Sequence, residues 1–202
     1  MSDGKMWEIE DGFFSDGVGT ICGVDEAGRG PLSGPVFAAA VLLPAGLYIE
    51  GLNDSKKLTP KKRDALFDTI CREAVSFGIA SASVEEIDEM NILEADLLAM
   101  RRAIAMLSPA PDFALIDGNC TKEFTLPTAP VIKGDAKSCS IAAASILAKV
   151  SRDRLCEEHD RLYPEYGFAK HKGYGTAAHM EAIRKYGPCP LHRKTFLKFL
   201  DK

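Results

Sequence analysis

The sequence lacks long apolar runs and closely spaced cysteines. Its longest apolar run, Val36 to Leu43, has eight residues, whereas about twenty are needed to span a bilayer. The first residues are polar and acidic, with no apolar segment like that of a signal peptide. No two of the six cysteines form a C-x-x-C pair, so we expect reduced, buried thiols. These absences predict a cytoplasmic protein without a membrane partner.

Common nucleotide-binding and metal-binding motifs are also missing. None of the four histidines lies in an H-E-x-x-H arrangement. Gly23 and Gly28 have the spacing of a phosphate-binding P-loop, but Arg29 and Gly30 follow where that loop needs Lys and Ser or Thr. Gly28 and Gly30 also resemble a dinucleotide fingerprint, which Pro31 interrupts. The glycines therefore either let the main chain approach a ligand closely or form a tight turn between two strands.

The composition is that of a soluble globular chain. Hydrophobic residues make up 46% and charged residues 27% of the 202 residues, which fits one domain. The net charge of −4 argues, taken alone, against a nucleic-acid partner. However, residues 1–119 carry 10 basic and 20 acidic side chains, and residues 120–202 carry 15 and 9. The second part therefore has either a basic face or a differently solvated surface.

Hydrophobic periodicity predicts an α/β domain over residues 19–202, with a mixed β-sheet and a helical C-terminal portion. Residues 1–18 are expected to form a loosely held acidic extension. Strands are expected at 20–24, 36–43, 77–84 and 113–117. Helices are expected at 59–75, 84–107 with a break near Asn91, 138–162 and 176–186.

Four acidic residues stand at the ends of expected elements. Asp25 and Glu26 end the first strand, Asp117 ends the strand at 113–117, and Asp135 precedes the long helix. In open α/β sheets, sites gather at the carboxyl ends of strands. Converging carboxylates repel each other unless cations lie between them, and Mg²⁺ or Mn²⁺ suits oxygen ligands.

Each of these acids also has an alternative explanation. Asp135 could be a helix N-cap, and Asp117 could begin a turn with the glycine that follows. Adjacent residues of a strand point to opposite faces. Glu26 must therefore turn at the strand end to join Asp25, or contribute its main-chain carbonyl.

Basic and polar side chains recur beside the acidic positions. Lys56 and Lys57 follow an Asp-Ser pair, and Lys137 and Ser138 follow Asp135. Tyr174 lies between two glycines in a Lys-His-Lys-Gly-Tyr-Gly-Thr segment. A ring presented from such a turn can stack on a sugar or base, and lysines and hydroxyls can bind phosphate. Each group alone is equally consistent with a solvated or packed surface.

Taken together, these segments resemble the ribonuclease HII family, the type 2 ribonucleases H. The resemblance covers about residues 19–196 and rests on motifs in the family's order. They are Gly-Val-Asp25-Glu26-Ala-Gly-Arg-Gly, Asp54-Ser-Lys-Lys-Leu, Leu-Ile-Asp117-Gly, Lys-Gly-Asp135-Ala-Lys-Ser, His-Lys-Gly-Tyr174-Gly-Thr and Gly187-Pro-x-Pro-x-His192-Arg.

The resemblance implies a ribonuclease H-like fold and cleavage of RNA in RNA/DNA hybrids and at single ribonucleotides in duplex DNA. It implies two Mg²⁺ or Mn²⁺ ions bound by Asp25, Glu26, Asp117 and Asp135, and products with 5′-phosphate and 3′-hydroxyl ends. Gly28, Arg29 and Gly30 would read 2′-hydroxyls, and Tyr174 would sense the junction with deoxyribose. Lys56, Lys57, Lys137 and Ser138 are expected phosphate contacts.

Two alternative functions remain open from the sequence. One is a metal-dependent nuclease of similar fold that acts on DNA junctions or all-RNA duplexes, and the other is a non-catalytic hybrid-binding module. A monomer is expected. A sliding-clamp partner stays unknown, because the segment Thr195 to Leu200 is more typical of a short packing helix than of a clamp-binding peptide.

Overall fold

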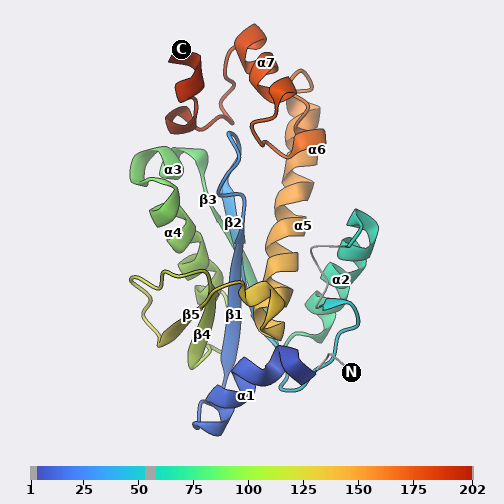
Figure 1. Ribbon diagram of the computed structural model, residues 1–202, viewed down its shortest axis with the longest axis vertical. Coiled ribbons are helices and arrows are strands. Elements are labelled where there is room, and N and C mark those ends of the chain that lie inside the picture. Colours follow the sequence, from blue (N-terminus) through green and yellow to red (C-terminus); the bar gives the residue numbers. More distant parts are fainter. Residues whose placement is uncertain (1–3, 53–57, 202) are drawn as a thin grey trace.

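A five-stranded mixed sheet forms the centre of the computed structural model, which describes residues 4–52 and 58–201 (Figure 1). The strand order is β3-β2-β1-β4-β5. The β1–β2 and β2–β3 pairs are antiparallel, and the β1–β4 and β4–β5 pairs are parallel. The strands are β1 (Ile21–Ala27), β2 (Val36–Leu42), β3 (Ser76–Ala82), β4 (Phe113–Asp117) and β5 (Thr128–Val131). This arrangement confirms the predicted α/β class.

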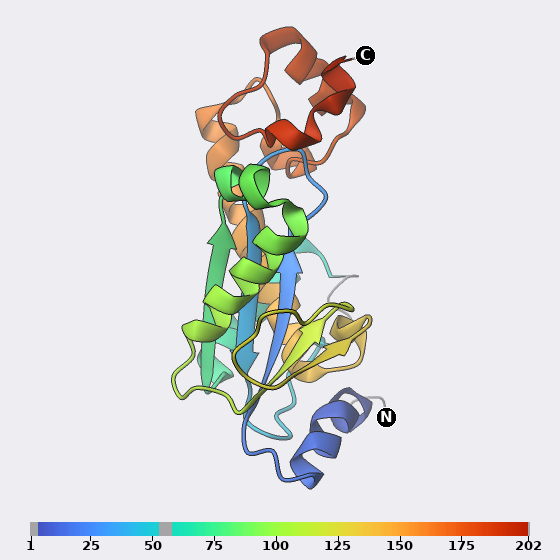
Figure 2. The same ribbon diagram turned by 90° about the vertical axis from the view of Figure 1, so that its left-hand side faces the viewer.

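Helices cover both faces of the sheet, as Figure 2 shows with α4 in front of it and α5 behind. The C-terminal elements gather at one end of the molecule and α1 at the other (Figure 1). The α-helices are α1 (Glu8–Ser15), α2 (Pro60–Glu73), α3 (Val84–Met90), α4 (Ile92–Ala105), α5 (Cys139–Leu162), α6 (Phe168–His171) and α7 (Ala177–Tyr186). Short 3₁₀ turns are η1 (Gly4–Trp7), η3 (Gly134–Ala136), η4 (Lys194–Phe196) and η5 (Lys198–Asp201).

Strand β1 alternates between the two helical layers. Cys22 and Val24 pack in the cluster on the α4 side, so Gly23 and Asp25 point to the α5 side. A Cβ atom at Gly23 would lie 2.1 Å from the main chain of Ser140 in α5. Glycine at this position therefore lets α5 approach the sheet closely, next to Asp25.

The predicted helix break at Asn91 is confirmed. Asn91 has a φ of 76°, and its side chain accepts hydrogen bonds from the N–H groups of Leu93 and Glu94. It thus ends α3 and caps α4. Strand β5 was not predicted, because it is only four residues long and contains Pro130, a residue confined to edge strands and bulges.

The first helix is held against the core, so the expectation of a loosely held N-terminal segment is wrong. Phe13 and Ile9 pack on a cluster formed by β1, β4 and α5. Glu10 is 1% exposed, and its Oε1 accepts hydrogen bonds from Ser138 Oγ at 2.6 Å and Ser140 Oγ at 2.7 Å. Residues 6–16 therefore belong to the packed structure, while the domain boundary after residue 18 stays a prediction.

No helix within the described ranges combines the length and apolar character needed to cross a bilayer. The segment from Thr195 to Leu200 packs on the protein instead of extending from it. Leu197 is buried, and Phe196 and Phe199 pack against two apolar clusters.

Two buried histidines form a hydrogen-bonded chain in the C-terminal portion. His179 Nδ1 lies 2.9 Å from the carbonyl oxygen of Tyr174, and the Nε2 atoms of His179 and His192 are 3.1 Å apart. The carbonyl can only accept, so His179 carries its proton on Nδ1 and accepts at Nε2 from His192. His192 Nδ1 then accepts from the N–H of Cys189 at 3.0 Å. The two bonds in which a ring nitrogen accepts require that nitrogen to be unprotonated, so this arrangement holds two neutral imidazoles.

We expect acid to destabilise the protein through His179. Burial lowers the pKa of His179 to about 4, from an ordinary value near 6.5. Between these pH values the unfolded chain binds the extra proton, so the free energy of unfolding falls by about 2–3 kcal/mol as the pH drops from about 6.5 to 4. Urea unfolding at several pH values measures this fall. Subtracting the free energy of unfolding of His179→Gln from that of the parent at each pH removes the effect of the carboxylates that both proteins share. Parallel curves of this free energy against pH for the two proteins would contradict the expectation.

Candidate active site

Three of the four predicted acidic residues meet at one edge of the sheet. Asp25, Glu26 and Asp117 each offer a carboxylate oxygen, and these atoms all lie within 4.8 Å of one another. Asp25 is buried, with 5% of its surface exposed, and Glu26 and Asp117 are half-buried. Oxygen ligands at this spacing suit a hard divalent cation.

The strand register explains how adjacent residues contribute to the same cluster. Asp25 and Asp117 lie on the α5 face, since Val24 and Ile116 pair and both pack on the α4 side. Glu26 starts on the opposite face. Strand β4 ends at Asp117, so no residue of β4 pairs with Glu26. Strand β1 continues through Ala27, so the backbone does not turn at Glu26 as the sequence predicted, yet a carboxylate oxygen of Glu26 still lies within 4.8 Å of those of Asp25 and Asp117.

The cluster is electrostatically unfavourable without a cation. Burial raises the pKa of Asp25 well above its ordinary value, and the charges of Glu26 and Asp117 raise it further. Burial also raises the pKa of Glu26, against the opposing effect of Arg29. A divalent ion between the oxygens would relieve both the burial cost and the repulsion. The residues present therefore fit a metal site.

Asp135 lies beside the cluster but is not among the oxygens grouped within 4.8 Å. It is buried in η3. The N–H of its neighbour Gly134 donates to Asp117 Oδ1 at 2.6 Å, so η3 is attached directly to the cluster. Its role as a fourth metal ligand stays a prediction.

A further acidic residue, Asp96 on α4, was missed by the sequence analysis. It is 2% exposed, and its Oδ2 lies 3.5 Å from Arg29 Nε, while Glu26 Oε1 lies 3.9 Å from Arg29 Nη1. Burial and the nearby charge of Glu26 raise the pKa of Asp96 to about 8. The sequence signal for its burial was spacing, because Asp96 precedes the apolar Ala99 and Met100 by three and four residues and so lies on the same face of the helix.

The glycine turn and Tyr174 line one cleft beside the acidic cluster, although they are far apart in the sequence. The cleft has a volume of about 370 Å³ and is lined by Glu26, residues 28–30 and Tyr174, among others. Tyr174 is 48% exposed, and a Cβ atom on Gly30 would lie 3.5 Å from its ring. This distance is an ordinary van der Waals contact and shows that the turn and the ring adjoin each other.

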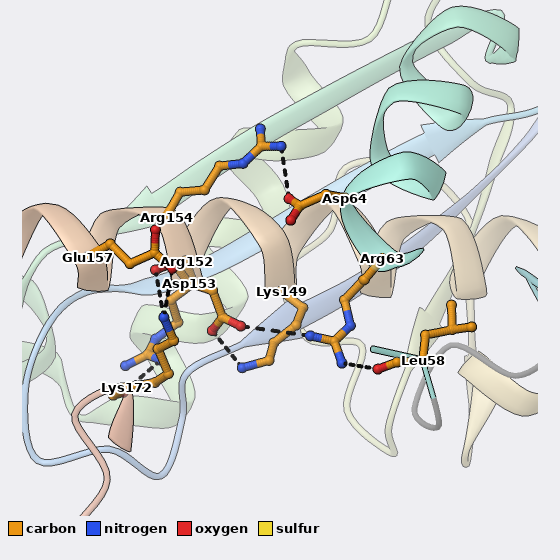
Figure 3. Close-up of polar contacts among 9 residues, drawn as sticks. All are labelled: Leu58, Arg63, Asp64, Lys149, Arg152, Asp153, Arg154, Glu157 and Lys172. Carbon is orange, nitrogen blue, oxygen red and sulfur yellow. Dashed lines mark hydrogen bonds and ion pairs between the residues drawn. The ribbon is translucent and has the colours of Figure 1, made fainter. Parts of the chain in front are cut away.

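Cationic side chains from α2 and α5 line the same cleft, namely Arg63, Lys149 and Arg152. Figure 3 shows Asp153 beside two of them: its Oδ1 lies 2.6 Å from Lys149 Nζ and its Oδ2 lies 3.8 Å from Arg63 Nη1. These three residues were not predicted from the sequence. On the predicted helix, Lys149 and Arg152 follow Ser145 at i+4 and i+7, a spacing that places all three on one face.

The remaining predicted contacts have different outcomes. Ser138 is fully buried. Its hydroxyl accepts from the N–H of Ile141 and donates to Glu10, which corrects the expectation that this side chain is free to contact a substrate. Lys137 is exposed. Lys56 and Lys57 lie outside the described residues.

Comparisons with known proteins agree with this arrangement. The family model for ribonuclease HII matches residues 22–199. Ribonuclease HII from Caldicellulosiruptor saccharolyticus is 54% identical over 196 residues, covering 97% of this chain and 96% of the relative. Ribonuclease HII 1 from Methylibium petroleiphilum is 59% identical over 174 residues, covering 86% and 88%.

A solved structure shows the same fold. The crystal structure of ribonuclease H2 from Pyrococcus horikoshii matches with a TM-score of 0.74 and 29% identity, covering 91% of this chain and 98% of that chain. The family match spans most of the sequence, including the strands that carry Asp25, Glu26 and Asp117. This chain therefore belongs to the ribonuclease HII family.

Proposed function

We propose that this chain cuts the RNA strand of RNA/DNA hybrids, and duplex DNA at single embedded ribonucleotides, by hydrolysis with two Mg²⁺ or Mn²⁺ ions. As a ribonuclease HII, it is a metal-dependent nuclease of the ribonuclease H type. The observation that carries the proposal is that Glu26, one of the three clustered carboxylates, lines the same cleft as the glycine turn and Tyr174. One cleft thus offers a metal site beside groups suited to recognising a sugar.

Asp25, Glu26 and Asp117 would hold the ions, with Asp135 as the fourth ligand. When bound, such ions lower the pKa of the attacking water and stabilise the leaving 3′-oxygen. The carboxylates themselves bind and orient and do not attack. This division fits their crowding, since a metal pair needs several anionic oxygens in one place.

The other side chains of the cleft would bind and orient the duplex. Main-chain groups of Gly28, Arg29 and Gly30 would contact the 2′-hydroxyl, the group that distinguishes RNA from DNA. Tyr174 would stack on the neighbouring sugar and favour deoxyribose there. Arg63 and Lys149 would contact phosphates, as would Lys137 and, from the undescribed segment, Lys56 and Lys57.

The direct test is cleavage of a DNA duplex that contains one ribonucleotide. We expect a single cut with Mg²⁺ or Mn²⁺, with 5′-phosphate and 3′-hydroxyl ends, and no cut with EDTA. An all-DNA duplex and an all-RNA duplex are the controls. Cleavage in EDTA would refute the metal role, equal cleavage of the all-DNA duplex would favour a junction nuclease, and binding without any product would favour a non-catalytic module.

Asp25→Asn should abolish the response to metal without unfolding the protein. The amide removes one buried charge from a crowded cluster, so the metal-free variant should melt at the same temperature as the parent or higher. For the parent, Mn²⁺ at about a hundredfold excess over its Kd should add about 2.7 kcal/mol of stability. Calorimetry with and without Mn²⁺ measures this gain in stability, and the variant should lose most of it. The cleavage rate of the variant should fall at least about 10²-fold. Glu158→Gln, at an exposed acid of α5, should keep both.

Tyr174→Ala should discriminate between substrates. Base and sugar stacking on an aromatic ring contributes about 1–3 kcal/mol, so kcat/KM should fall about 5- to 150-fold on the single-ribonucleotide duplex and less on a long hybrid. Tyr48→Ala provides a matched control, because Tyr48 is 61% exposed and lies outside the cleft. Equal losses on both substrates would count against junction sensing.

A further inference from the structure

We propose that Arg193 is the positioning residue of the glycine turn: it binds the carbonyls of Gly28 and Arg29 and thereby aims the N–H groups of Arg29 and Gly30 into the cleft. This inference rests on the proposed function and identifies what makes the turn selective for ribose. Arg193 itself does not line the cleft.

The guanidinium of Arg193 forms three hydrogen bonds with the turn and the segment after it. Nη2 donates to Gly28 O at 2.6 Å, Nη1 to Arg29 O at 2.9 Å, and Nε to Gly34 O at 2.8 Å. The side chain is fully buried. The planar guanidinium holds its N–H groups in fixed directions and can bind several carbonyls at once. A lysine ammonium on its flexible chain does not offer donors in fixed directions.

Peptide geometry converts these contacts into a direction for the N–H groups. In a planar trans peptide, the C=O of one residue and the N–H of the next point in opposite directions. Because Gly28 O and Arg29 O point toward Arg193, the N–H groups of Arg29 and Gly30 point away from it. Residues 28–30 line the cleft, so the opposite side of the turn is the cleft side. Among the described residues, neither N–H has an acceptor.

The chain around Arg193 is itself fixed to the turn. Its N–H donates to Leu32 O at 2.9 Å, and Gly34 donates its N–H to Leu191 O at 2.8 Å. Ser33 and His192 form an isolated β-bridge. The guanidinium therefore approaches the carbonyls from a second segment, residues 191–193, which is itself bonded to residues 32–34. This arrangement keeps the N–H groups of Arg29 and Gly30 pre-organised for an incoming oxygen.

The chemistry of the contact favours a functional role over simple packing. Within the described ranges, Arg193 has no carboxylate at ion-pair distance. Burial accordingly lowers its pKa to about 9. The Phe196 ring, whose centroid lies 5.1 Å from the guanidinium carbon, is an aromatic contact and not a counter-charge. A buried cation without a carboxylate partner is costly, and neutral donors would hold a loop at less cost. A cation, however, polarises the peptides that it binds and strengthens the opposite N–H groups as donors.

The test compares binding of two duplexes by Arg193→Lys and Arg193→Gln in the Asp25→Asn background, where cleavage is blocked. One duplex contains a single ribonucleotide and the other is all DNA. The expected result is a fall of about 10-fold or more in the preference for the ribonucleotide duplex, from the loss of at least one charge-assisted contact. Affinity for the all-DNA duplex should stay within about twofold, because phosphate contacts are untouched.

A matched control and a metal measurement separate this role from general support of the fold. Arg102→Lys removes an arginine that also donates to a main-chain carbonyl, Ser81 O, outside the cleft, and should leave the preference unchanged. With Asp25 intact, Arg193→Lys should keep the Mn²⁺-induced rise in melting temperature.

An unchanged ribonucleotide preference in the Arg193 variants would overturn the inference. Parallel losses of DNA affinity and metal response, or failure of both variants to fold, would make Arg193 a general support and would overturn it equally. Failure of the proposed function is distinguishable, because it would appear in the protein with Arg193 intact as a lack of preference for the ribonucleotide duplex.

Discussion

Repulsion among three carboxylates at the ends of two neighbouring strands is the constraint on which the rest of the site depends. Asp25, Glu26 and Asp117 are brought together by the parallel pairing of β1 and β4. Within residues 4–52 and 58–201, no lysine lies at ion-pair distance from these three carboxylates. The protein's cations stand at the rim of the cleft, and Arg29 is divided between Glu26 and Asp96. The repulsion among the carboxylates is therefore only partly offset by nearby positive charge. The cationic side chains at the rim instead carry charge that suits phosphates.

The sequence predicted those features that depend on local pattern. Apolar strands followed directly by acids located the carboxylates, and Asn91 marked a helix boundary through its own side-chain capping. The features that were missed depend on distant partners. The buried state of Asp96 depends on how α4 packs against the sheet, and the docking of α1 depends on Glu10 meeting Ser138. Ser138 looked like a phosphate ligand because its neighbours are polar, yet the fold turns it inward to cap α5.

The C-terminal portion and the sheet edge form one recognition unit. Tyr174 is held through its carbonyl by His179, which is bonded to His192, and His192 neighbours Arg193. The main chain of Tyr174 and the glycine turn are thus both held by buried side chains, and Arg152 also donates to the carbonyls of Lys172 and Ser33. These bonds hold the backbone that carries the ring in a fixed position relative to the turn.

The bond between Arg193 and the glycine turn also orders events during synthesis of the chain. The carbonyl of Gly28 binds the guanidinium of Arg193, which lies 165 residues later in the chain. At ordinary rates of translation, Arg193 is synthesised about 8–30 s after Gly28. Strands β1 and β2 are both synthesised long before that, whereas the turn between them can gain the bonds from Arg193 only at the end. A growing polypeptide on the ribosome therefore contains Asp25, Glu26 and Asp117 before it contains the side chain that binds the carbonyls of the glycine turn.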